Sequence, residues 1–162
     1  MSTQLGYWDA GSLKRPATDA AGFKVNNGTN FPWDSYEFDA SSPESVFAFG
    51  KLPQAPIYIA SATVKIRICW VTDSSTTGTV VWRMGILGVK STETWDTAIT
   101  DYDDVESTRS GSGKKLEAEI SLVAPSLEPG DSIVIQITRV ADDSGDNYGA
   151  DASLVEVELL AA

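Results

Sequence analysis

Hydrophobic and polar residues alternate along most of the chain after residue 40, and this period of two is typical of strands with one buried face. The segment 115–122 is the clearest case, because its apolar residues are separated by Lys, Glu and Ser. The same alternation marks the segments 46–49, 64–70, 80–87, 133–138 and 155–159. No stretch of about ten residues has the apolar spacing of an amphipathic helix. The pattern therefore predicts an all-β domain.

Turn residues separate the predicted strands. Stretches rich in Ser, Thr, Gly, Asp or Pro lie at 73–78, 111–113 and 128–131, and these residue types supply the backbone geometry of tight connections. About seven or eight strands joined in this way predict an antiparallel β-sandwich of jelly-roll type. Immunoglobulin-type packing is the alternative, but the Cys-Trp-Cys arrangement of that fold is absent from the sequence.

Residues 1–40 lack the alternation, and Gly, Pro and Asn recur along them. We therefore expect an extended N-terminal arm at 1–40, followed by the jelly-roll domain at 41–162. Aromatic side chains along the arm would be costly to leave in water, so we expect them to pack against a neighbouring chain. The alternative is that the arm adds strands to its own sandwich. The candidate interface residues are Tyr7, Trp8, Phe23, Phe31 and Trp33.

Charge limits the choice of partners. The net charge is −11, and Lys and Arg form no cluster along the sequence. Such a surface repels nucleic acids and anionic membranes, but it can attach to a basic or neutral protein surface. The N-terminus has no secretory signal pattern, and no apolar run approaches the length of a membrane helix. We therefore expect neither a nucleic-acid nor a membrane partner, and synthesis and folding in a cytoplasm.

The sequence contains no histidine and one cysteine, Cys69. These two facts exclude Ser-His-Asp and Cys-His nucleophilic sites and ordinary zinc sites. No glycine-rich phosphate-binding motif is present. We therefore expect no enzyme activity, no catalytic residue, no cofactor and no metal ligand. Cys69 lies in an alternating apolar run and is interpreted as a small buried hydrophobe.

Two acidic stretches, 93–106 and 142–151, are interpreted as a solvated loop and a long hairpin connection. A calcium site at 142–151 stays open as an alternative, although the spacing does not fit the EF-hand pattern. A glycosidase carboxylate pair is a further alternative. Arg139 is expected to pair with Asp142 or Asp151.

The tryptophans could form a platform on which sugars stack. Trp70 and Trp82, however, alternate in phase with core aliphatic residues, which favours core packing. Trp95 lies in a loop and is the better sugar candidate.

Several motifs, in the same order along the chain, resemble a family of small phage and prophage structural proteins. The first half carries an Ala-Gly, an Arg-Pro and a small-residue pair, then a Phe-Asp-Ala block that leads to a Glu, an aromatic strand and a Pro. The second half carries a strand that ends in Trp, a Ser/Thr-rich turn, a Val-Val-Trp strand, an Arg, an Asp-rich turn and an Asp-Ala-x-Leu strand. The motifs lie at 9–22, 38–44, 47–53, 70–82, 139–146 and 151–154.

The resemblance implies a jelly-roll virion protein, often trimeric. The leading hypothesis is a bacteriophage capsid decoration protein on the virion surface, assembled in the host cytoplasm. It would be a homotrimer whose arm clasps a neighbouring subunit, the major capsid protein or another virion protein. One alternative is a tail or head fibre or spike component that binds a host surface. Another, from a different class, is a carbohydrate-binding module.

Overall fold

The computed structural model describes residues 3–54, 63–109, 114–123 and 126–161. Within these ranges the chain forms ten strands and one short 3-10 helix. In chain order they are β1 (Thr3–Asp9), η1 (Ala10–Ser12), β2 (Gly22–Asn27), β3 (Pro32–Phe38), β4 (Glu44–Lys51), β5 (Thr63–Val71), β6 (Thr79–Val89), β7 (Asp101–Thr108), β8 (Leu116–Val123), β9 (Ser132–Arg139) and β10 (Ala152–Ala161). No helix in the described part of the chain is long and apolar enough to cross a membrane.

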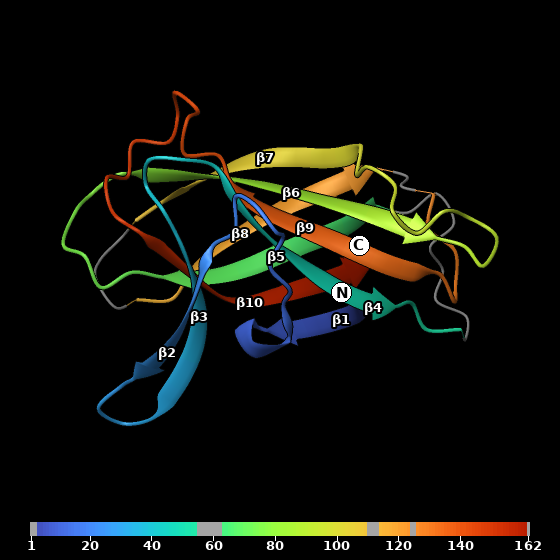
Figure 1. The fold of residues 1–162 in the computed structure, drawn as a ribbon, viewed down its shortest axis with the longest axis horizontal. Coiled ribbons are helices and arrows are strands. Elements are labelled where there is room, and N and C mark those ends of the chain that lie inside the picture. The colour runs from blue at the N-terminus through green and yellow to red at the C-terminus, as the bar shows by residue number, and fades with distance from the viewer. Residues whose placement is uncertain (1–2, 55–62, 110–113, 124–125, 162) are drawn as a thin grey trace.

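The strands form two antiparallel sheets that lie one over the other (Figure 1). One sheet has six strands in the order β2-β3-β10-β5-β8, with β1 also paired to β10. The other has four strands in the order β4-β9-β6-β7. This architecture confirms the predicted antiparallel β-sandwich of jelly-roll type.

The core lies between the sheets and contains the residues that the alternation assigns to the buried face. Ile66 and Trp70 on β5 and Met84 and Ile86 on β6 are all at most 1% exposed. Trp70 and Trp82 meet across the core, with ring centroids 6.1 Å apart. Both tryptophans are therefore core residues, as their phase predicted. Cys69 is also buried, and this burial raises the pKa of its thiol to about 11.

Residues 3–38 do not form the expected extended arm, because they contribute β1, β2 and β3 to the six-stranded sheet. The alternative, in which this segment adds strands to its own sandwich, describes the structure. The β2–β3 hairpin projects beyond the two sheets (Figure 1). Phe23 and Val25 on β2 are therefore 45% and 57% exposed. Without one consistently buried face, these strands show no period of two.

The second correction concerns the acidic stretch 93–106, whose second half belongs to strand β7 and not to a loop. Among the strands of the described residues, β7 pairs only with β6 in the four-stranded sheet and forms its edge. Charged residues are common on edge strands because they discourage pairing with another chain. The carboxylates of β7 hide the hydrophobic alternation that marks the other strands.

β10 changes partner halfway along its length. Ala152–Leu154 pair with β3, whereas Glu156–Ala161 pair with β1 on the same edge. Between these two stretches, the register with β5 shifts at Val155. Such a β-bulge bends a strand and re-aims its side chains.

Candidate functional site

The outer face of the four-stranded sheet carries rows of side chains that strand pairing brings together. Phe47 on β4 lies opposite Gln136 on β9, which lies opposite Gly85 on β6. In the next row, Phe49 lies opposite Val134. These outward-facing residues alternate with core residues such as Ala48 and Ile135. The centre of this face is therefore apolar and aromatic.

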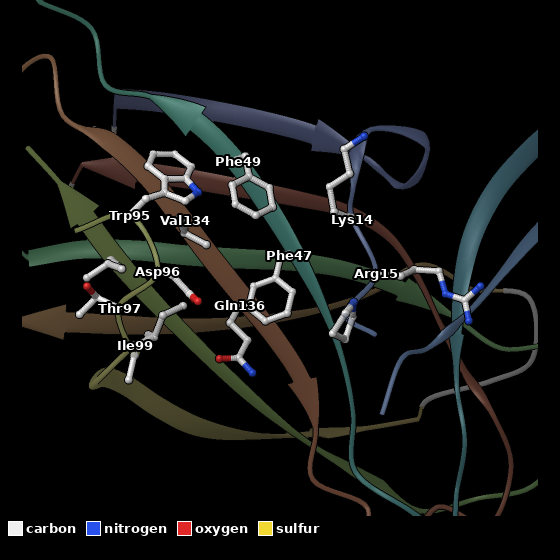
Figure 2. Close-up of a pocket in the computed structure, with 13 residues that line it drawn as sticks. Lys14, Arg15, Phe47, Phe49, Trp95, Asp96, Thr97, Ile99, Val134 and Gln136 are labelled. Carbon is white, nitrogen blue, oxygen red and sulfur yellow. The ribbon is translucent and has the colours of Figure 1, made fainter. Parts of the chain in front are cut away.

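Two segments rise on either side of this face and form a groove of about 750 Å³ (Figure 2). Residues 14–16 form the first wall. They are held to the edge of β4, because Lys14 N donates to Phe47 O at 2.8 Å and Phe47 N donates to Lys14 O at 2.9 Å. Residues 95–99, from the connection between β6 and β7, form the other wall.

Gly85 allows the second wall to approach the sheet. A Cβ atom at this position would lie 2.8 Å from Ile99 Cγ2 and 2.9 Å from the backbone oxygen of Asp101. These separations are shorter than van der Waals contact. The glycine therefore leaves the space that Ile99 fills, and the position of the wall depends on it.

The groove is lined at one end by stacked aromatic rings. Phe49 and Trp95 have ring centroids 6.2 Å apart and planes inclined by 19°, and the Phe47 centroid lies 6.5 Å from that of Phe49. Figure 2 shows Trp95 facing Phe49 from the loop, with Phe47 farther along β4. Phe49 and Trp95 are 40% and 54% exposed. Aromatic surface left open to water in this way is typical of a binding site.

Polar groups lie beside the aromatic rings. Gln136 Nε2 donates to Ser45 Oγ at 3.2 Å and to Thr138 Oγ1 at 3.3 Å, and the two hydroxyl oxygens lie 2.7 Å apart. Lys14 and Asp96 lie on opposite walls, with Phe47 and Phe49 between them, and the side chain of Arg15 points away from the groove (Figure 2). Within the described residues, neither Lys14 nor Asp96 forms an ion pair. Both groups are free to contact a ligand.

A charged row continues the same face beyond Ser45 and Thr138. Arg83 binds Asp104 through two hydrogen bonds of 2.7 Å, and its guanidinium carbon lies 4.8 Å from the Tyr102 ring centroid. The hydrogen bond to Asp104 raises the pKa of Arg83. The outer face thus changes from aromatic at one end to hydrogen-bonding at the other.

The acidic loop 142–151 is held by Arg139. The guanidinium binds Asp146 Oδ1 and Oδ2 at 2.8 and 3.0 Å, and it also donates to the backbone oxygens of Phe38, Tyr148 and Ala150. Arg139 therefore pairs with Asp146 and not with Asp142 or Asp151, the two expected partners. Among the residues that the structure describes, no group of three or more His, Cys, Asp or Glu side chains could hold a metal ion.

The structure brings three of the five candidate interface residues together and places Trp8 and Phe23 elsewhere. Tyr7, Phe31 and Trp33 lie around hollows in the six-stranded sheet. Trp8 is partly buried, and its Nε1 donates to Phe49 O at 2.9 Å. Phe23 packs against Tyr36, with ring centroids 5.3 Å apart. Their expected role in a subunit or capsid interface stays a prediction.

Of the groove residues, the sequence indicates Trp95 as a sugar-stacking candidate, whereas Phe47 and Phe49 are not among its candidates for a binding surface. Their signal is present in the alternation, since both are out of phase with the buried residues Val46 and Ala48. Two aromatic residues on the solvent side of one strand indicate a contact surface.

No protein-family model and no curated protein sequence matches the chain. Among solved structures, the chain is similar to TmCBM27, a carbohydrate-binding module with specific mannan recognition, at 10% identity and a TM-score of 0.51, covering 100% of this chain and 99% of that one. It is also similar to the CBM22 tandem domain of Paenibacillus barcinonensis Xyn10C, at 15% identity and a TM-score of 0.51, covering 99% of this chain and 50% of that one.

A third similar structure is an arabinose-bound α-L-arabinofuranosidase, at 13% identity and a TM-score of 0.56. The match covers 93% of this chain, which spans 23% of the length of that protein. At these identities the likeness concerns the fold. The chain therefore has the jelly-roll β-sandwich fold found in carbohydrate-binding modules.

Proposed function

We propose that the groove on the four-stranded sheet binds a carbohydrate chain. The observation that carries this proposal is the set of adjacent rings of Phe47, Phe49 and Trp95, of which the last two are exposed, with Gln136 and Asp96 beside them. A pyranose ring has an apolar face of C–H groups and an equator of hydroxyls. Binding it calls for flat aromatic surface next to hydrogen-bonding groups.

The open shape of the groove supports a polysaccharide ligand over a single small sugar. The polar row that contains Ser45, Thr138 and Arg83 continues the face past Gln136 along the strand direction. A chain that stacks on Phe49 and Trp95 would extend over this row. Its hydroxyls would bind there to the side chains of Ser45 and Thr138.

The fold is compatible with this proposal, because the similar solved structures include a carbohydrate-binding module described as recognising mannan. Their identity to this chain is too low to transfer a ligand, and the sugar is therefore to be determined by experiment. The carbohydrate-binding alternative weighed from the sequence is thus the hypothesis that the groove favours. Capsid decoration and homotrimer assembly stay predictions, and copy number in purified phage particles tests the first of them.

We further propose that the protein binds its ligand without cleaving it. Glycoside hydrolysis requires two carboxyl groups on either side of the scissile bond, about 5–9.5 Å apart. Asp96 is the one carboxylate among the described residues that line the groove. Incubation with any polysaccharide that binds should therefore release no reducing sugar, and release that is lost in Asp96→Asn would contradict this part of the proposal.

Affinity electrophoresis against a panel of soluble polysaccharides, followed by calorimetry with those that bind, tests the proposal. We expect Trp95→Ala and Phe49→Ala each to weaken binding about tenfold, as expected for loss of one stacking ring. Trp33→Ala, which removes a tryptophan from the other sheet, is the matched control and should leave binding unchanged. Retention of no polysaccharide, or equal losses in Trp33→Ala and Trp95→Ala, would refute the proposal.

A further inference from the structure

A second concave surface lies on the six-stranded sheet, where β10 changes partner. β3 leaves the edge of β10 at Leu154 and β1 joins it at Glu156. The side chains around this junction enclose two hollows of about 450 and 210 Å³. Trp33, Val155 and Glu156 line both hollows, so Trp33 stands between them. We call this the Trp33 surface.

The Trp33 surface is aromatic and acidic. Phe31 and Tyr7, which are 68% and 50% exposed, extend the apolar area on either side of Trp33. Four carboxylates line the two hollows, against one cation. The carboxylates are those of Asp9, Asp34, Asp73 and Glu156, and the cation is Lys115.

Little of this negative charge is neutralised within the molecule. Glu156 accepts a hydrogen bond from Tyr7 Oη at 3.1 Å and lies 3.6 Å from Lys115 Nζ. In the described part of the chain, Asp34 and Asp73 form no ion pair. The nearby Lys24 is bound to Glu37 at 2.6 Å. Each hollow therefore presents at least one carboxylate that is available to a cation from outside.

We propose that the Trp33 surface docks an extended basic segment of a partner protein, with one Lys or Arg side chain in each hollow and the Trp33 indole between them. Charge complementarity identifies this occupant, because four carboxylates face one ammonium. The Trp33 ring adds a face suited to a guanidinium or ammonium group. A second copy of the chain, with its net charge of −11, would bring like charge to the surface.

This inference is independent of the carbohydrate proposal, since the two surfaces lie on different sheets and share no lining residue. A protein with both surfaces could hold a glycan on one side while it is anchored to another protein on the other.

Fluorescence anisotropy with the full chain and a fluorescein-labelled peptide of alternating Arg and Ser tests the proposal. We expect binding to the wild type, and about tenfold weaker binding to Trp33→Ala because one aromatic contact is lost. The double variant Asp34→Asn/Asp73→Asn, which removes one carboxylate from each hollow, should weaken binding by a similar factor. A peptide of alternating Glu and Ser should not bind.

The matched control is Asp101→Asn/Asp142→Asn, which changes net charge equally at two exposed carboxylates that form no hydrogen bond or ion pair within the described residues. It separates docking from general attraction to an acidic protein. Equal losses in the two double variants, or no peptide binding to the wild type, would overturn the proposal. Thermal unfolding of each variant identifies any loss that comes from misfolding. A neutral polysaccharide is also tested for its ability to displace the peptide. If it displaces the peptide from the wild type but does not bind Trp33→Ala, the Trp33 surface binds sugars, and the basic-segment proposal is refuted.

Discussion

The outer faces of the two sheets satisfy their exposed side chains in different ways. Along β5, β8 and β10 of the six-stranded sheet, charges pair with each other. Glu119 binds Lys65 at 2.7 Å and Arg67 at 2.8 Å, and Arg67 also approaches Glu158 at 3.5 Å. At the centre of the four-stranded sheet, aromatic and aliphatic side chains face outward and two loops form walls around them. Paired charges on a sheet face are already satisfied in water, whereas exposed aromatic side chains are stabilised when a partner covers them.

The largest expected effect concerns the buried ion pair between Arg139 and Asp146, which holds the loop 142–151. Asp146→Ala would leave the Arg139 guanidinium charged and without its partner at a site where both side chains are at most 1% exposed. Breaking such a pair costs about 3–5 kcal/mol. Urea unfolding measures the loss. Asp104→Ala breaks the equally bidentate but exposed pair with Arg83 and should cost about 0–1 kcal/mol. Similar losses in both variants would show that burial does not distinguish the pairs.

Gly85→Ala should disturb the groove while it leaves the six-stranded sheet intact. The added Cβ would lie 2.8 Å from Ile99 Cγ2, so the wall at 95–99 must move away from the sheet. Overpacking of this kind costs about 1–3 kcal/mol. Gly149→Ala is the control, because a Cβ there meets nothing within 4 Å. Thermal unfolding gives the cost, and near-UV circular dichroism should report altered packing of Trp95 in the first variant alone.

Glu119→Gln should change how stability depends on pH. Hydrogen bonds from Lys65 and Arg67 hold the pKa of Glu119 below its ordinary value. A carboxylate with a lowered pKa stabilises the fold above the pKa it has in the unfolded chain, and this contribution is lost as pH falls through the lowered value. As pH falls from the pKa of Glu119 in the unfolded chain to its lowered pKa in the folded protein, the difference in free energy of unfolding between the wild type and Glu119→Gln should therefore decrease. The effect should be about 0–1 kcal/mol, as for other pairs near the surface. If the free energies of unfolding of the two proteins change in parallel with pH over this range, the pKa of Glu119 is not lowered in the folded protein.

The smallest expected effect is the coupling between the two surfaces. If the groove and the Trp33 surface act separately, Trp33→Ala should leave polysaccharide binding unchanged, and the double variant Trp33→Ala/Trp95→Ala should match Trp95→Ala within about 0.5 kcal/mol. Calorimetry on the four proteins measures this coupling. A coupling energy above this value would show that the groove and the Trp33 surface are energetically coupled through the β-sandwich.

Local pattern was sufficient to predict the parts of the fold with one buried face. Leu116 to Leu122 read as a half-buried strand and form β8, and Trp70 and Trp82 lie in the core as their phase indicated. The pattern failed at 22–38 because β2 and the first half of β3 extend past the core and have no buried face, and only the end of β3, with Tyr36 and Phe38, reaches the core. It failed at 101–108 because the charges of an edge strand conceal the alternation.

The candidate site was harder to predict because it depends on contacts between distant residues. The loop position of Trp95 indicates a sugar-stacking candidate, but the stacking of Trp95 on Phe49 exists only in the folded chain. Lys14 reaches the groove through backbone pairing with Phe47, which no local signal reports. In the same way, the sequence suggests Asp142 or Asp151 as the partner of Arg139, whereas the loop conformation selects Asp146.

The backbone pairing of residues 14–20 with β4 also has a consequence for aggregation. Ser45 N donates to Asp19 O at 2.7 Å, and the amide and carbonyl of Phe47 are both bound by Lys14. Trp8 Nε1 donates a hydrogen bond to the carbonyl oxygen of Phe49. Four backbone groups of this edge are thus occupied by the chain itself. At the opposite edge, the carboxylates of β7 repel an incoming copy. Molecules crowded together on a common scaffold can therefore expose the four-stranded sheet without pairing edge to edge with the sheets of their neighbours.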